Sequence, residues 1–244
     1  MNRVYLRSPS WTAIYLPGLG FQMLSVLYKN LPELALRWIG KLRAQVKKRP
    51  LRDALPDNVR ARGVFRRYDS FEGLEVDLSN AFLCAARSRG IVTYRMWNEA
   101  IQIRKRYDIK PAMLLGMGLG GWIVKEVYNN GVRIRRDYLK PPSNEFKALA
   151  YITYQITRDV AYETGALAYN VDAILFPYTQ RIDDLVMRVR SLYAAKFGLS
   201  DWYISLKVTH KKVSFFHRGL GFEYVLQDAL SGERKSWITC AHTI

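Results

Sequence analysis

Two aspartates could hold metal ions for phosphate chemistry. Asp77 lies in the apolar stretch of residues 74–82, L-E-V-D-L-S-N-A-F, and Asp172 lies in residues 166–178, A-L-A-Y-N-V-D-A-I-L-F-P-Y. An ionised carboxylate inside a buried strand is costly unless a cation or a turn compensates it. Two carboxylates on neighbouring strands can share a pair of divalent cations, Mg²⁺ or Mn²⁺, with the phosphates of a substrate. The two stretches therefore predict a metal site formed by Asp77 and Asp172.

The net charge of the chain predicts an acidic partner. The 244 residues include 38 lysines and arginines but only 21 aspartates and glutamates, which gives a formal charge of +17. This excess is well beyond what solubility requires, and it favours a nucleic acid over an anionic membrane surface. The hydrophobic content of 49% can form a substantial core and excludes a disordered tail.

Cysteine usage and the N-terminal stretch bear on the compartment. Cys84 and Cys240 are far apart and form no CxxC pair, so neither a zinc framework nor a disulfide scaffold is expected. A reducing compartment fits, and we expect the cytoplasm, or the host cytoplasm if the source is a virus. Residues 11–28 are largely apolar but are interrupted at Pro17 and by glycines. We expect this stretch to pack in a core or on a partner and not to span a membrane.

A basic helix and an arginine-rich loop follow in the N-terminal region. Residues 31–48 place apolar side chains four positions apart with lysine and arginine on the other faces, which predicts an amphipathic helix. Pro50 and Pro56 end it. Two interpretations of the loop remain open, an arm that follows phosphates and a solvated basic surface. Its arginines are Arg49, Arg52, Arg60, Arg62, Arg66 and Arg67.

The middle of the chain predicts helices and a hairpin after the strand that carries Asp77. A helix is expected over residues 93–107, with Thr93 as its N-cap. Residues 122–138 alternate around an Asn-Asn-Gly turn and predict a β-hairpin. The second strand of this hairpin carries a basic stripe that is expected to face solvent, Arg133 and Arg135.

The second half completes an α+β pattern. Helices are expected over residues 145–164 and 181–197, on either side of the strand with Asp172, and short alternating strands over residues 202–241. The elements predict an α+β fold. Its expected divisions are a basic helical N-terminal region at residues 1–67, a core at 68–200 and antiparallel C-terminal strands at 201–244.

Three short motifs resemble those of palm-domain nucleic-acid polymerases. The segment D-L-S-N-A-F, from Asp77 to Phe82, resembles motif A, in which a metal-binding aspartate precedes an aromatic residue. The segment Y-N-V-D-A-I-L, which contains Asp172, resembles the motif C hairpin with the second metal-binding aspartate. Lys147 and Tyr154 have the seven-residue spacing of motif B in family B DNA polymerases. The similarity is nearest to the protein-primed type found in viruses and mobile elements.

The resemblance implies a fold and a set of roles. A palm-like antiparallel sheet with packed helices would hold Asp77 and Asp172 as ligands of Mg²⁺ or Mn²⁺. Lys147 would contact the incoming nucleoside triphosphate, Tyr154 would position the nucleotide, and Phe82 would act as the steric gate against a ribose 2′-hydroxyl. DNA is then the expected nucleic acid. The sequence departs from the family in having Val171 and Ala173 beside Asp172, where family B has Asp-Thr-Asp.

A second hypothesis needs no catalysis. The chain would be a basic nucleic-acid-binding or packaging protein of a virus or mobile element, whose cations only contact phosphates. In that case Asp172 is a turn residue, Asp77 caps the helix that follows it, and Lys147 and Tyr154 are surface groups. Under either hypothesis, Lys211 and Lys212 beside His210 are expected to contact phosphate.

Overall fold

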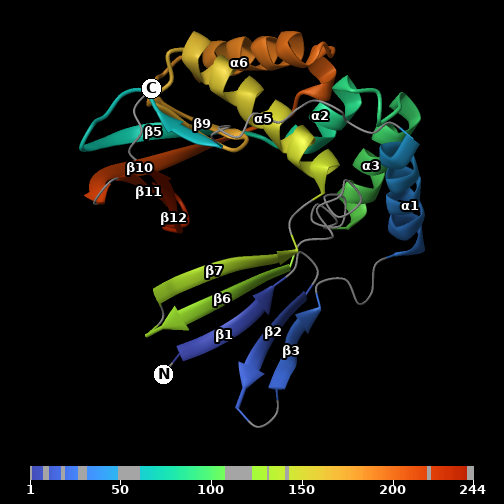
Figure 1. Ribbon diagram of the computed structural model, residues 1–244. Coiled ribbons are helices and arrows are strands. Elements are labelled where there is room, and N and C mark those ends of the chain that lie inside the picture. Colours follow the sequence, from blue (N-terminus) through green and yellow to red (C-terminus); the bar gives the residue numbers. More distant parts are fainter. Residues whose placement is uncertain are drawn as a thin grey trace. The chain divides into compact units, whose positions relative to one another are not determined.

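The computed structural model describes residues 2–7, 11–17, 20–26, 32–48, 61–107, 123–130, 132–140, 143–218 and 221–240. The chain forms two compact units, each assembled from two stretches of sequence. Unit 1 comprises residues 1–53 and 89–148, and unit 2 comprises residues 54–88 and 149–244. Both units combine helices with antiparallel strands (Figure 1), which confirms the α+β class. The units interleave in sequence, whereas the expected divisions at residues 67 and 200 were consecutive.

Unit 2 is built on a seven-stranded antiparallel sheet with the order β12-β11-β10-β5-β9-β8-β4. Its strands are β4 (Arg62–Val64), β5 (Ser70–Leu78), β8 (Ala168–Asn170), β9 (Ala173–Pro177), β10 (Leu206–Arg218), β11 (Gly221–Asp228) and β12 (Arg234–Cys240). The strand β5 is central, and its two neighbours, β9 and β10, come from much later in the chain. Its helices are α2 (Ala81–Ser88), most of α5 (Asn144–Glu163) and α6 (Ile182–Phe197). Strands β5, β8, β9 and β10 with their connecting helices have the order of a split β-α-β-β-α-β arrangement.

The two faces of the β5 region bury different side chains. Leu74, Val76 and Leu78 alternate along β5 and are at most 1% exposed, so they project from one face of the sheet. A second apolar cluster fills the opposite face, and it includes Leu175, Val213, Leu226 and Trp237. Residues 73–76 of β5 are therefore buried on both faces of the sheet, although Glu75 and Asp77 interrupt the apolar sequence of the strand.

Unit 1 has a five-stranded sheet with the order β3-β2-β1-β6-β7. The strands are β1 (Asn2–Arg7), β2 (Trp11–Leu16), β3 (Gly20–Val26), β6 (Ile123–Asn129) and β7 (Val132–Lys140). Two helices, α1 (Glu33–Lys48) and α3 (Tyr94–Arg106), pack together. Trp38 of α1 is 1% exposed, and its indole N–H donates to the carbonyl oxygen of Met96 over 2.8 Å.

Most expected elements are confirmed, and the exceptions are the start of the chain and the strand expected around Asp172, which is two strands, β8 and β9, with Asp172 in their turn. The helix over 31–48, the helix capped by Thr93, the hairpin around Asn130 and the C-terminal strands are all present. The helical beginning of the N-terminal region was wrong for residues 2–7, 11–16 and 20–26, which form β1, β2 and β3. These strands are stabilised by pairing of β1 with the distant β6, which local patterns do not reveal.

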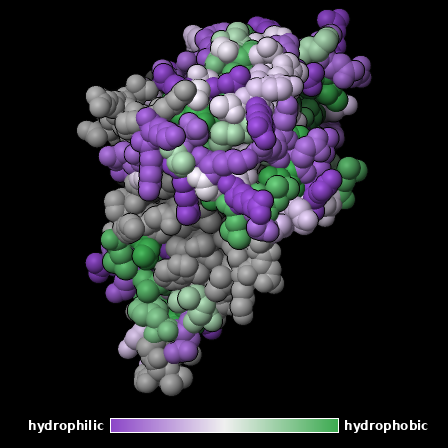
Figure 2. Space-filling view, turned by 90° about the vertical axis from the view of Figure 1, so that its right-hand side faces the viewer, coloured by the Kyte–Doolittle hydropathy of each residue, from purple (hydrophilic) through white to green (hydrophobic). Residues whose placement is uncertain are grey.

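One face of the described residues is mainly polar. Purple hydrophilic side chains predominate on the face seen in Figure 2, and green hydrophobic ones form small separate patches. Among the described helices, none combines the length and the apolar character that crossing a membrane requires.

Candidate active site

The β8–β9 hairpin brings Asp172 beside Asp77. Asp77 is the next-to-last residue of β5 and pairs with Ala173, the first residue of β9. The following residue, Leu78, donates its backbone N–H to the carbonyl oxygen of Asp172 over 2.9 Å. Two aspartates from distant parts of the sequence therefore lie on adjacent backbone segments at one end of the sheet. Both side chains are partly buried.

The turn before Asp172 has an unusual backbone conformation. Val171 has φ of 59°, in the left-handed region that β-branched residues rarely adopt and that costs roughly 1–2 kcal/mol. Its backbone N–H donates to the carbonyl oxygen of Ala61 over 2.6 Å. This bond from the segment before β4 holds the strained turn, and strain of this kind clusters at functional sites.

The charges of both carboxylates affect the pKa of one buried tyrosine, Tyr193. Tyr193 on α6 is 0% exposed, and its hydroxyl donates to the hydroxyl of Thr157 on α5 over 3.3 Å. Burial raises the pKa of Tyr193 above its ordinary value, the bond to Thr157 lowers it, and the charges of Asp172 and Asp77 raise it further. Because both carboxylates act on one hydroxyl, they belong to one electrostatic neighbourhood.

A transverse row of side chains crosses the sheet at Asp77. Residues that pair directly across antiparallel strands project from the same face. The pairing across β4, β8, β9, β5 and β10 joins Arg62, Asn170, Ala173, Asp77 and Lys207. The exposed Lys207 is the cross-strand neighbour of Asp77, so a cation stands beside the carboxylate. Sequence reasoning missed Lys207 because no local pattern predicts which strand pairs with β5.

Two amide oxygens near the aspartates were also missed. The Oδ1 atoms of Asn170 and Asn80 are buried and accept no hydrogen bond from the described part of the chain. Asn170 ends β8, two residues before Asp172, and Asn80 follows β5 at the start of α2. A buried amide oxygen without a donor is costly, and a bound cation would compensate it.

The donor set fits a hard divalent cation that binds together with a substrate. Within the described ranges, no group of three or more His, Cys, Asp or Glu side chains could hold a metal alone. The available ligands are the carboxylates of Asp77 and Asp172, with the amide oxygens of Asn80 and Asn170 close to them in the chain. All are the oxygen ligands that Mg²⁺ and Mn²⁺ prefer, and substrate phosphates and water can complete such a shell.

Phe82 of motif A and both residues of motif B lie on helices. Phe82 is the second residue of α2, directly after β5, and Tyr154 lies midway along α5; both are partly buried in unit 2. Lys147 is exposed in the first turn of α5 and belongs to unit 1. Seven residues correspond to nearly two helical turns, so Lys147 and Tyr154 share one side of α5.

The arginine-rich loop is only partly described. Arg49, Arg52 and Arg60 lie outside the described residues. Arg62 is in β4, and Arg66 and Arg67 follow it, all with exposed side chains. The hydroxyl of Tyr224 donates to the carbonyl oxygen of Arg66 over 2.7 Å, so the backbone of this exposed basic segment is held against β11.

A β-bulge separates the two arginines of the expected stripe. The register of β6 and β7 shifts between Val127 and Tyr128, so Arg133 pairs with Tyr128 and Arg135 with Val127. Adjacent residues of β6 project from opposite faces, and the two arginines therefore do not form one stripe. The physical reason is the extra residue that a bulge inserts in one strand, which resets its alternation.

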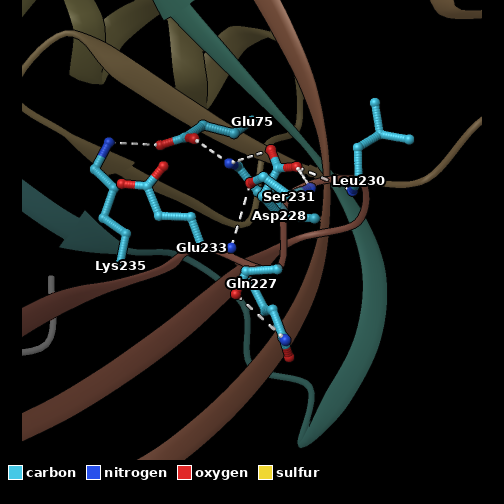
Figure 3. A network of polar contacts seen from close by, with 9 residues as sticks. Glu75, Gln227, Asp228, Leu230, Ser231, Glu233 and Lys235 are labelled. Carbon is cyan, nitrogen blue, oxygen red and sulfur yellow. Dashed lines mark hydrogen bonds and ion pairs between the residues drawn. The ribbon is translucent and has the colours of Figure 1, made fainter.

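Lys211 forms part of a buried ion-pair network and not of an exposed phosphate site. Its ammonium lies 3.0 Å from Asp228 and 3.6 Å from Glu75, which is 5% exposed. Lys235 lies 3.0 Å from Glu75 on the other side (Figure 3). Strand alternation turns Lys211 toward these carboxylates and leaves Lys212 exposed, so the expectation of a phosphate contact was wrong for Lys211. For Lys212 it stays a prediction.

The thiol of Cys84 belongs to the core. Cys84 is fully buried in α2, and its sulfur lies 3.8 Å from the carbonyl oxygen of Tyr203. Burial raises the pKa of Cys84 to about 12. The thiol therefore stays protonated at neutral pH and is a poor nucleophile.

Comparisons with known proteins give no relative: no family model, curated protein or solved structure matches the chain.

Proposed function

We propose that this chain is a minimal template-dependent nucleotidyltransferase, similar to DNA polymerases of the palm type, with Asp77 and Asp172 as metal ligands. The carrying observation is the pairing of β5 with β9, which joins Asp77 to Ala173 and Leu78 to Asp172. An antiparallel sheet with helices over one face supports the proposal, because the resemblance to palm domains implies the same arrangement. The unsatisfied oxygens of Asn80 and Asn170 support a cation nearby.

In this proposal, different residues would bind the metal ions, the triphosphate and the sugar of the incoming nucleotide. Two Mg²⁺ or Mn²⁺ ions bound at Asp77 and Asp172 would lower the pKa of the attacking hydroxyl and stabilise the leaving pyrophosphate. Lys207 lies beside Asp77, and its positive charge would stabilise the phosphates of a nucleotide bound there. On the resemblance, Lys147 contacts the triphosphate, Tyr154 positions the nucleotide and Phe82 excludes a ribose 2′-hydroxyl.

The partners in this proposal are nucleoside triphosphates and a nucleic acid, with DNA as the template, in the cytoplasm of a cell or of a host. The charge of +17 supports a nucleic-acid partner. The same charge favours the second candidate, a packaging or binding protein without catalysis, because phosphate contacts need neither carboxylate. The two functions differ in whether Asp77 and Asp172 matter for activity.

Primer extension on a primed DNA template tests the proposal. With Mg²⁺ or Mn²⁺ and deoxynucleoside triphosphates, Asp77→Asn and Asp172→Asn should each lower incorporation by roughly a thousandfold, because each removes a metal ligand. Binding of the primed template without metal should change less than about twofold, because neither substitution removes a cation from the protein. Asp184→Asn, at an exposed position in the first turn of α6, is the matched control and should extend the primer normally.

Two results would contradict the proposal. The first is that the wild-type chain incorporates no nucleotide on any primed DNA or RNA template with either metal. The second is that Asp77→Asn and Asp172→Asn extend the primer as well as Asp184→Asn does. Intact binding in either case would favour the packaging protein.

A further inference from the structure

One face of the unit 1 sheet gathers arginines and tyrosines around a single carboxylate. In the register of β1 with β6, Arg3 pairs with Tyr128 and Tyr5 with Glu126. In the register of β6 with β7, the same two residues pair with arginines. Alternation adds Arg7 to this face. The arginine–tyrosine face consists of Arg3, Tyr5, Arg7, Glu126, Tyr128, Arg133 and Arg136.

Glu126 holds three guanidinium groups in place. It is 4% exposed, and its carboxylate lies 3.1 Å from Arg7, 2.9 Å from Arg133 and 3.6 Å from Arg136. The hydroxyl of Tyr128 donates to it over 3.1 Å. One carboxylate neutralises one of three positive charges, and the arginine side chains remain 44%, 47% and 40% exposed. The face is therefore preorganised and carries excess positive charge.

The aromatic rings lie among these cations. Tyr5 and Tyr128 pack edge to face with their ring centroids 5.4 Å apart. The guanidinium of Arg7 lies 5.4 Å from the first ring and 5.8 Å from the second. Both tyrosines are only partly buried. Arginine forks match phosphate oxygens, and accessible rings offer platforms for unpaired bases.

We propose that the arginine–tyrosine face binds a single-stranded nucleic acid, with guanidinium groups on its phosphates and tyrosine rings against its bases. The inference rests on the proposed function for the class of partner, nucleic acid, but uses none of the residues around Asp77 and Asp172. A single strand is the occupant because a duplex hides its base faces from the rings. The β-bulge is essential, because it directs Arg133 to this face and Arg135 away from it.

Fluorescence anisotropy with the full chain tests the proposal. The probe is a labelled DNA strand of mixed sequence and about 20 nucleotides, in EDTA and without nucleotides, at several salt concentrations. Arg133→Gln should weaken binding roughly fivefold and reduce the salt slope by about 0.7, the value for one phosphate contact on a single strand. Arg133→Lys keeps the charge and should recover most of the affinity. Arg135→Gln is the matched control. Arg135 pairs across the strands with Val127 and so projects from the opposite face, where it forms an ion pair with Asp137 over 2.8 Å. The loss of affinity in this variant should stay below about twofold.

Glu126→Gln tests the preorganisation of the face. It removes the charge that holds the three guanidinium groups, so binding should weaken by roughly threefold although the face gains net positive charge. Stronger binding would mean that only net charge draws the strand to this face, which contradicts the proposal. Thermal melting of each variant distinguishes loss of folding from loss of binding.

Other outcomes also overturn the inference. Equal losses for Arg133→Gln and Arg135→Gln would mean that only net charge matters. Equal affinity for a duplex of the same sequence would exclude recognition of unpaired bases. Stronger, Arg133-dependent binding to vesicles of phosphatidylserine and phosphatidylcholine would assign the face to a membrane surface. Because no metal or nucleotide is present, none of these results depends on primer extension, and failure of extension leaves this inference intact.

Discussion

The backbone N–H of Leu78 donates to the carbonyl oxygen of Asp172 over 2.9 Å, and this bond ties the tip of the β8–β9 hairpin to the end of β5. It involves no side chain of Asp77 or Asp172. Substitution of either carboxylate therefore leaves the donor and the acceptor of this backbone bond in place. For this reason Asp77→Asn and Asp172→Asn are suitable probes of the chemistry.

Val171→Gly should stabilise the protein and lower nucleotide incorporation. Glycine adopts the φ of 59° without steric cost, and the relief should raise the free energy of unfolding by about 0.5–1 kcal/mol. A looser turn should at the same time hold Asp172 less firmly and lower the incorporation rate. Urea denaturation and primer extension measure the two effects.

The control for Val171→Gly is Val208→Gly. Val208 lies in regular strand β10, where it pairs with Val76, and glycine there should lower stability by about 1 kcal/mol. A Val171→Gly variant that is destabilised like Val208→Gly would show that the turn is not strained.

Glu75→Ala should destabilise the protein by about 3 kcal/mol, because it leaves the buried Lys211 with one carboxylate fewer. Lys235, the other partner of Glu75, has a side chain that is 51% exposed. Lys235→Ala should therefore lower the free energy of unfolding by no more than about 1 kcal/mol. Urea denaturation measures both. If Glu75→Ala abolished primer extension and left stability unchanged, Glu75 would be a metal ligand, and the network in Figure 3 would not be structural.

Asp228 should make stability depend on acid pH. The backbone N–H of Ser231, the ammonium of Lys211 and the backbone N–H of Leu230 hold the pKa of Asp228 well below its usual value. A lowered pKa in the folded state gives a stabilisation that is complete above the unfolded pKa of about 4 and is lost as the pH falls below it. Asp228→Asn should therefore lower Tm at pH 7.

The difference in Tm between the wild-type chain and Asp228→Asn should narrow as the pH is lowered from about 5 to about 2. Asparagine still accepts the two backbone N–H groups, so the comparison isolates the charge. Thermal melting at a series of pH values measures this difference. A constant gap over the whole range would mean that ionisation of Asp228 does not contribute to folding.

Two glycine-to-alanine substitutions should have opposite effects. A Cβ on Gly63 in β4 would meet the ring of Tyr169, with Cζ at 2.8 Å, and this overpacking should cost about 1–3 kcal/mol. A Cβ on Gly40 within α1 meets nothing within 4 Å, so Gly40→Ala should stabilise by about 0.5–1 kcal/mol. Urea denaturation of both variants measures the difference, and a neutral Gly63→Ala would mean that β4 can move away from Tyr169.

The α+β class and most elements followed from local patterns. The amphipathic period of α1, the Thr93 cap and the Asn-Gly turn of the β6–β7 hairpin act within a few residues, so the sequence displays them directly. The position of Asp77 on a strand was also legible from its apolar run. The single strand expected around Asp172 is instead two strands, β8 and β9, with Asp172 in the turn between them. Strands β1 to β3 were missed because β1 joins them to the distant β6, a pairing that local patterns do not reveal.

By itself, the sequence determined which residues have suitable chemistry: two aspartates in apolar stretches and a large excess of arginine and lysine. Only the tertiary structure decided their neighbours. Strand pairing set Lys207 opposite Asp77 and buried Lys211 between Glu75 and Asp228. One bulge in β7 placed Arg133 against Glu126. The physical reason is that a strand alternates every residue, so a shift of one position in a distant pairing reverses which side chains face each other.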